Sequence, residues 1–117
     1  MILPVAVDAL GGDKAPDEIL QGVVDAVAAG IDCAVVGPEN LQSLTKVNIA
    51  GLPLIPASEV IAMDEDPAGG VRRKKDSTLV RAAEAVRDGK ASAMISAGNT
   101  GATMASALLR MGRVKGV

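Results

Sequence analysis

Residues 3–20 read LPVAVDALGGDKAPDEIL, and this stretch decides the fold. The apolar run over residues 3–7 predicts a short buried strand that ends at Asp8. A glycine-rich loop follows over residues 9–14. Pro16 then suits the first turn of a helix, because its missing N–H would have no intrahelical partner there anyway. Strand, glycine loop and helix in this order are typical of one unit of an α/β fold.

The rest of the chain repeats this alternation. The first helix is predicted to end at Gly30, with further helices over 39–44, 77–88 and 102–111 and strands over 33–36, 52–55 and 91–95. Prolines weaken the third of these strands, and residues 63–75 are predicted to form a charged loop. Strand and helix thus alternate four times, which favours a mostly parallel sheet covered by helices.

Composition excludes several classes of function. The 117 residues are 49% hydrophobic, carry a net charge of −2 and contain no Phe, Tyr or Trp. Near-neutral charge and the lack of stacking side chains disfavour nucleic-acid binding. With Cys33 as the single cysteine and no histidine, neither a Cys/His zinc cluster nor a Ser–His or Cys–His nucleophile pair is available. No signal peptide and no bilayer-length apolar run is seen, so we expect a cytoplasmic location.

The end of the chain suggests an incomplete domain. Residues 113–117 directly follow the last predicted helix, where an α/β fold normally feeds its next strand. A sheet of four strands is thin and has a poorly covered edge. We therefore expect residues 1–117 to be the N-terminal portion of a single α/β catalytic domain, and expect this portion alone to be marginally stable.

Two polar, glycine-rich loops lie where a ligand is expected. In open α/β sheets, ligands bind at the carboxyl ends of the strands, and helix N-termini there offer free N–H donors to phosphate. The candidate residues of the first loop are Asp8, Gly11, Gly12 and Asp13, and those of the second are Ser96, Gly98, Asn99, Thr100 and Gly101. A second interpretation stays open, in which the glycines form tight turns and the aspartates only cap turns and helices.

A run of four basic residues, Arg72, Arg73, Lys74 and Lys75, precedes a predicted helix that either Asp76 or Ser77 can cap. Arginine binds phosphate bidentately, whereas lysine acts as a point charge. The run is expected to attract either phosphate or an acidic partner protein. The alternative is a solvated loop whose charge is balanced by the acidic residues 64–66. The sequence has no Gly-x-Gly-x-x-Gly and no P-loop motif, which disfavours a nucleotide-binding module.

Three segments together resemble one family. Residues 7–16, VDALGGDKAP, resemble the opening of the bacterial phosphate acyltransferases of the PlsX family, which typically reads VDAMGGDHAP. Residues 58–61 through 72–77 resemble the central motif of that family, and residues 96–102 match its SAGNTGA segment without change. Lys14 stands where the family has histidine, which puts any role of that histidine in doubt here.

The resemblance implies a fold, an activity and partners. The fold would be Rossmann-like with three layers, similar to phosphate acetyltransferases and isocitrate-dehydrogenase-type enzymes. The reaction would transfer a fatty acyl group reversibly from acyl carrier protein to inorganic phosphate for phospholipid synthesis, without a metal or organic cofactor. The family also implies a homodimer and peripheral association with the inner face of the membrane. Family members are considerably longer than this chain, so we expect the chain alone to be inactive.

On this hypothesis the phosphate or oxyanion site takes its polar side chains from the second loop. Ser96, Asn99 and Thr100 are the predicted catalytic residues. The predicted substrate- and phosphate-binding residues are Asp8, Gly11, Gly12, Asp13, Arg72, Arg73, Lys74, Lys75, Gly98 and Gly101. Two alternatives stay open: a phosphate acetyltransferase-like enzyme that uses an acyl-coenzyme A, and a non-catalytic truncated product.

Overall fold

A computed structural model describes residues 2–112 of the chain. Its centre is a four-stranded, fully parallel sheet in the order β3-β2-β1-β4. The strands are β1 (Val5–Asp8), β2 (Cys33–Gly37), β3 (Leu54–Pro56) and β4 (Ala93–Ile95). Val5 pairs with Cys33 on one side and with Ala93 on the other, so β1 is central. The predicted parallel sheet is confirmed.

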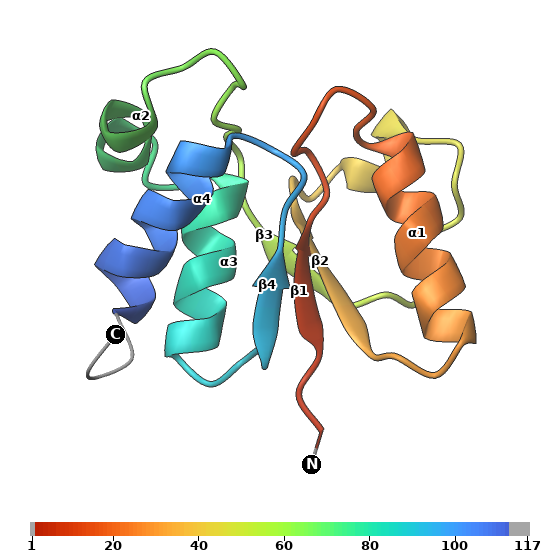
Figure 1. The fold of residues 1–117 in the computed structure, drawn as a ribbon. Helices are drawn as coiled ribbons and strands as arrows, with labels where there is room; N and C mark the ends of the chain where they lie inside the picture. The colour runs from red at the N-terminus through yellow and green to blue at the C-terminus, as the bar shows by residue number, and fades with distance from the viewer. Residues whose placement is uncertain (1, 113–117) are drawn as a thin grey trace.

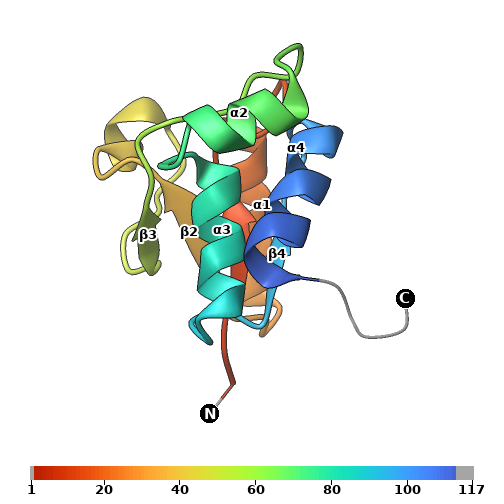
Figure 2. The same cartoon turned by 90° about the vertical axis from the view of Figure 1, so that its left-hand side faces the viewer.

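Helices cover both faces of the sheet. The helical elements are α1 (Asp17–Ala28), α2 (Pro67–Arg73), α3 (Thr78–Arg87), α4 (Thr100–Ser106), the 3-10 turn η1 (Leu41–Leu44) and the π-helical turn η2 (Ala107–Met111). Figure 1 shows α1 on one face and α3 and α4 on the other. Figure 2 shows α2 lying across the upper ends of α3 and α4. These layers match the predicted α/β architecture.

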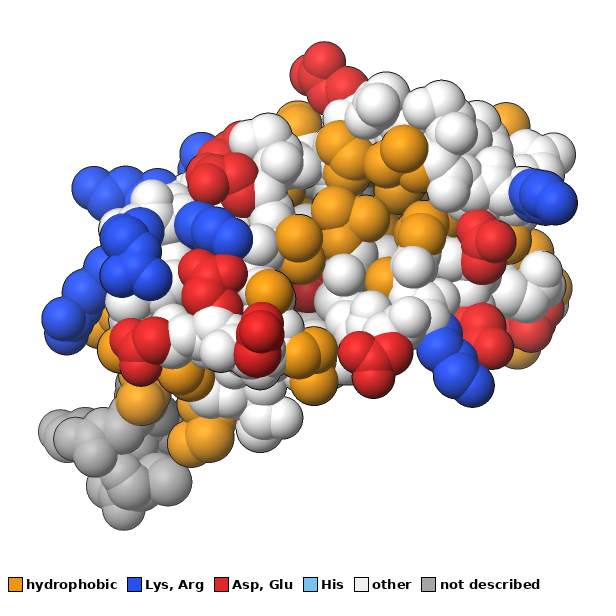
Figure 3. All heavy atoms as spheres, turned by 90° about the horizontal axis from the view of Figure 1, so that it is seen from above, with side chains coloured by type: hydrophobic (Ala, Val, Ile, Leu, Met, Phe, Trp, Pro, Cys, Tyr) orange, Lys and Arg blue, Asp and Glu red, His pale blue; other side chains and the backbone are white. Residues whose placement is uncertain are grey.

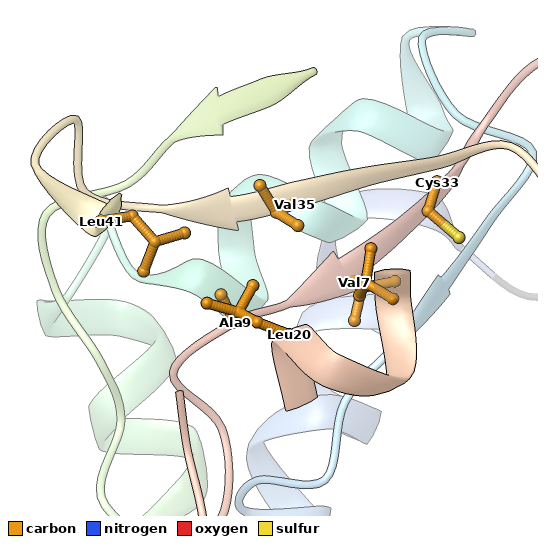
Figure 4. Packing of buried hydrophobic residues seen from close by; sticks show 7 residues of the cluster. Val7, Ala9, Leu20, Cys33, Val35 and Leu41 are labelled. Atoms are coloured by element: carbon orange, nitrogen blue, oxygen red, sulfur yellow. The ribbon is translucent and has the colours of Figure 1, made fainter. Parts of the chain in front are cut away.

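The alternation of side chains along the strands divides the core. On the α1 face, Val7, Cys33 and Val35 pack with Leu20 of α1 (Figure 4). Burial, followed by the nearby Asp32 charge, raises the pKa of the Cys33 thiol, so this side chain serves as a core residue. The opposite face uses smaller residues, because Ala6 of β1 and Ala82 of α3 belong to the same buried cluster. Alanines at this interface let α3 approach the sheet closely.

Residues 63–75 correct one prediction. They were expected to form a loop, but α2 occupies most of the segment and the prediction is wrong there. Asp66 caps the helix by accepting a hydrogen bond from the Gly69 N–H at 2.8 Å, and Pro67 occupies the first turn. Gly70 is needed for packing, since a Cβ there would lie 2.9 Å from Cγ2 of Ile61. The glycines that suggested a loop therefore allow close contact instead.

Other boundaries differ slightly from the predictions. The short helix expected over 39–44 is the 3-10 turn η1, and the last helix begins at Thr100 and ends as the π-helical turn η2. The helix capped by Ser77 is confirmed, with the Ser77 hydroxyl accepting from the Val80 N–H. The expectation drawn from residues 113–117 lies outside the described residues.

One edge of the sheet is open on the α1 face. The side chain of Ile95 in edge strand β4 is 58% exposed. It borders an apolar hollow of about 330 Å³ that also reaches Val5, Val7 and Ile19. Within residues 2–112, no helix has the length and apolar character that crossing a bilayer requires.

Candidate functional site

The two glycine loops meet at the carboxyl ends of β1 and β4. A Cβ added to Gly11 would lie 2.5 Å from Oδ2 of Asp8 and 2.8 Å from Oγ of Ser96. Gly12 has a φ of +97°, and its Cβ would lie 2.9 Å from the carbonyl oxygen of Ala97. Any side chain at either glycine would separate the loops. The predicted junction of the two loops thus exists, and it depends on glycine at these positions.

Asp8 and Ser96 join the loops by hydrogen bonds. Ser96 Oγ donates to Asp8 Oδ2 at 2.8 Å and accepts the N–H of Gly98 at 3.0 Å. The other carboxylate oxygen, Oδ1, accepts the N–H of Leu10 at 3.1 Å. Asp8 is only 1% exposed, so these contacts replace water around its carboxylate. The pair fixes the shape of both loops at the point where they touch.

Asn99 holds the second loop to a distant segment. Its Nδ2 donates to the carbonyl oxygens of Ala62 and Glu65, both at 2.9 Å, while its Oδ1 accepts the N–H of Ala102 at 3.0 Å. The residue is 4% exposed. Both ends of the amide are therefore occupied within the protein. The side chain expected to contact phosphate acts in this structure as the N-cap of α4 and as a clamp on residues 62–65.

Thr100 and several backbone N–H groups remain available. Thr100 is the first residue of α4 and is exposed. Among residues 2–112, its hydroxyl has no hydrogen-bond partner, and the N–H groups of Gly11, Gly12 and Gly101 have none either. Unpaired N–H groups beside glycines at a helix start are the usual donors to a bound phosphate. Gly101 also packs against α2, because its Cβ would lie 2.6 Å from Cγ of Pro67.

A surface hollow of about 410 Å³ opens beside the loop junction. Gly11, Gly12, Asp13 and Ala97 line it, and Lys14 brings a cation to its wall. Lys14 Nζ lies 3.8 Å from a carboxylate oxygen of Glu18, and both side chains are largely exposed. The hollow therefore combines backbone donors and one cation with two carboxylates, since Asp13 and Glu18 also line it. Ser96, Asn99 and Thr100 are not among its lining residues.

The basic run does not act as a unit. Lys74 turns inward, donating to the Val60 carbonyl at 2.9 Å and pairing with Glu65 at 2.7 Å. That hydrogen bond from Lys74 is the main cause that lowers the pKa of the Glu65 carboxyl. Arg73 folds back over α2, where its Nη1 would lie 2.7 Å from a Cβ on Gly69. Only Arg72 and Lys75 point together, toward η2.

The two halves of the central motif pair directly. The Ser58 hydroxyl and N–H both donate to Asp76 Oδ2, and Thr78 N–H donates to the Glu59 carbonyl at 2.9 Å. The Ser58 hydroxyl, followed by the Arg81 guanidinium, holds the pKa of the Asp76 carboxyl below its usual value. These contacts set where α3 begins. Among the described residues, these contacts of the motif thus hold residues 58–59 against the start of α3.

The structure brings part of the predicted site together. Asp8, Gly11, Gly12, Ser96 and Gly98 meet at the loop junction, Asp13 lines the adjacent hollow, and Thr100 begins α4 two residues after Gly98. The basic residues lie at the end of α2 and directly after it, at the left edge of the molecule in the view from above (Figure 3). Sequence reasoning overlooked Arg110, which lines the same hollow as Arg72 and Lys75. No motif marks Arg110, because its position follows only from the packing of η2 against α3.

Comparison with known proteins identifies the family. The sequence model of a family described as "Fatty acid synthesis protein" matches residues 3–117. The chain belongs to the fatty acid synthesis protein family. The match runs over essentially the whole chain, so both glycine loops and the basic run lie within the matched residues.

Similar members of the fatty acid synthesis protein family carry one name, phosphate acyltransferase. The protein of Heliobacterium modesticaldum is 45% identical over 97% of this chain and 36% of the relative. Those of Desulforudis audaxviator and Levilactobacillus brevis are 46% and 48% identical, over 97% and 98% of this chain and 34% of each relative. The chain spans about a third of the length of these curated relatives.

Proposed function

We propose that this protein, in its longest natural form, transfers a fatty acyl group from acyl carrier protein to inorganic phosphate. The observation that carries the proposal is the contact of the two glycine loops at the strand ends, with N–H groups at Gly11, Gly12 and Gly101 that have no partner among residues 2–112. The names of the relatives support an acyltransferase that uses phosphate. The carrier donor, a homodimeric assembly and peripheral membrane association remain predictions from the family resemblance.

The proposed reaction requires neither a nucleophilic side chain nor a strong general acid or base. A phosphate oxygen attacks the thioester carbonyl, the new C–O bond forms, and the C–S bond breaks as the thiolate leaves. Phosphate is already anionic at neutral pH, and a thiol with a pKa of about 8.5 is a good leaving group. The protein therefore has to bring the two reactants together and stabilise the oxyanion. N–H donors, a hydroxyl and nearby cations suit that task.

The residues at and beside the loop junction receive distinct roles on this proposal. Thr100 and the N–H groups of the loops contact phosphate or the oxyanion. Ser96 and Asp8 act as positioning residues, since their hydrogen bond holds the loops together and Gly98 in place. Asn99 positions α4 through its clamp on residues 62–65. Lys14 and Asp13 border the entrance to the hollow.

The direct test is acyl phosphate formation from acyl carrier protein and phosphate, trapped as the hydroxamate with hydroxylamine. The longest natural form of the protein should give a product that requires both phosphate and the acylated carrier. Omitting phosphate is the matched control, because free thioester also reacts with hydroxylamine. Equal amounts of hydroxamate with and without phosphate would refute the proposal.

The alternative donor is an acyl-coenzyme A, as in a phosphate acetyltransferase-like enzyme. Both donors present a thioester to the same phosphate site, so the loop junction fits either. Measuring kcat/KM for the same acyl group on the carrier and on coenzyme A separates them. We expect the carrier thioester to be preferred, and a preference for coenzyme A would favour the alternative.

A further inference from the structure

Helix α2 and the turn η2 enclose a second hollow, of about 400 Å³, on the outer side of the helical layer. Its lining consists of Val71, Arg72, Lys75, Leu109 and Arg110. Arg72 lies in the last turn of α2, and Lys75 follows two residues after the helix ends at Arg73. Arg110 reaches the hollow from η2. Three cations thus surround an apolar floor, and no carboxylate lines the hollow in the described part of the chain.

The three cations of this hollow differ in whether they already lie beside a carboxylate. Arg110 Nε lies 3.8 Å from Glu84 Oε2 and is buried, so this residue is anchored in place. Arg72 and Lys75 are exposed and form no ion pair among residues 2–112. Leu109 is 57% exposed, and the neighbouring Leu108 is 50% exposed. The surface therefore offers two free positive charges beside apolar side chains.

This hollow is separate from the loop junction. It shares no lining residue with the hollow beside Gly11 and Gly12. Arg110 lies in η2, beyond the end of α4, whereas Thr100 is the first residue of α4. Arg72 and Lys75 are therefore assigned to a contact other than the one with the reacting phosphate. They are well placed to bind a molecule that carries its reactive group at a distance from its own surface.

We propose that the α2–η2 hollow docks an acidic segment of the protein that delivers the acyl group. This inference rests on the proposed function, and it identifies which part of the chain meets the carrier. Carboxylates of the segment would face Arg72 and Lys75, while an apolar side chain would cover Leu109. An anionic lipid surface would meet the same two cations, and the experiments below distinguish it from the carrier.

The test is enzyme kinetics on the longest natural form of the protein. The double variant R72E/K75E should raise the KM for the acylated carrier about tenfold, as expected when two rim charge pairs become repulsive. The KM for phosphate should change much less. The control K46E/K90E makes the same change in net charge at exposed lysines elsewhere and should leave both KM values unchanged. R72Q/K75Q should raise the KM for the acylated carrier by an intermediate factor. This variant replaces R72E/K75E in the test if the charge reversal prevents folding.

A lysine footprint identifies the occupant independently of activity. Acetylation of Lys75 in the intact protein should be fast without carrier and suppressed with it, while acetylation of Lys46 should not respond. Protection of Lys75 without carrier would mean that other parts of the protein cover the hollow, and would overturn the proposal. An unchanged KM for the carrier in R72E/K75E would also overturn the proposal. The same holds if R72E/K75E loses binding to anionic vesicles while its KM for the carrier is preserved. Normal acyl phosphate formation alongside any of these would leave the proposed function intact.

Discussion

Replacing Asn99 tests whether its amide is a clamp or only a helix cap. Asn99→Ala removes the bond to Ala102 N–H, a cap contribution of about 1 kcal/mol. It also removes the two bonds of 2.9 Å to the carbonyl oxygens of Ala62 and Glu65, at about 1 kcal/mol net each. The free energy of unfolding should therefore fall by about 3 kcal/mol. Asn48→Ala, at an exposed asparagine whose Oδ1 accepts only the Ala50 N–H, should change it far less.

Asn99→Asp separates the two roles. A carboxylate still caps Ala102, and negative charge at a helix start is favourable. Its second oxygen, however, faces the carbonyl oxygens of Ala62 and Glu65 in place of a donor. Asn99→Asp should therefore destabilise the protein at least as much as Asn99→Ala. The measurement is urea unfolding followed by far-UV circular dichroism. A stable Asn99→Asp variant, with a loss of only about 1 kcal/mol for Asn99→Ala, would show that the residue is a cap and nothing more.

Two further predictions concern the loop junction and acid stability. Gly11→Ala should abolish acyl phosphate formation, because its Cβ would displace Asp8 and Ser96. The control Gly22→Ala has open space around it in α1 and should stabilise the protein by about 0.5–1 kcal/mol. Equal activity of the two variants would contradict the account of the junction. The lowered pKa of Asp76 contributes stability that is present above the ordinary value of 3.8 and is lost as the pH falls through the lower folded-state value. Asp76→Asn should therefore reduce the acid-dependent loss in unfolding free energy, and an unchanged pH profile would exclude this contribution.

The sequence was sufficient for the sheet and for the helices α1 and α3. Apolar runs such as residues 3–7 are distinctive, and Ser77 marks a helix start through its capping hydroxyl. The prediction from the sequence was wrong at α2, because Gly69 and Gly70 have low helix propensity. Tertiary contact explains the difference, since Gly70 lets α2 pack against Ile61. The pair Asp66-Pro67, an N-cap before a first-turn proline, was the local signal of this helix.

The meeting of the two glycine loops could be predicted from the sequence, but the contacts of their side chains could not. Strand ends and glycines located the junction of Asp8, Gly11 and Ser96, because parallel strands bring their carboxyl ends to one edge. Sequence could not show that Asn99 turns its amide toward residues 62–65, which are far away along the chain. Nor could it divide the basic run, because Lys74 is drawn inward by Glu65 and Arg72 is not.

The most direct measurement of the central claim is the KM for phosphate of Thr100→Ala in the hydroxylamine-trapped assay. The control is Thr103→Ala on the same helix, whose hydroxyl donates to the Asn99 carbonyl at 3.0 Å. Losing a hydrogen bond to a charged group should raise the KM for phosphate at least about tenfold in Thr100→Ala. Thr103→Ala should keep the value of the unmodified protein. A phosphate KM that is the same in all three proteins would contradict a phosphate site at the junction of the two glycine loops.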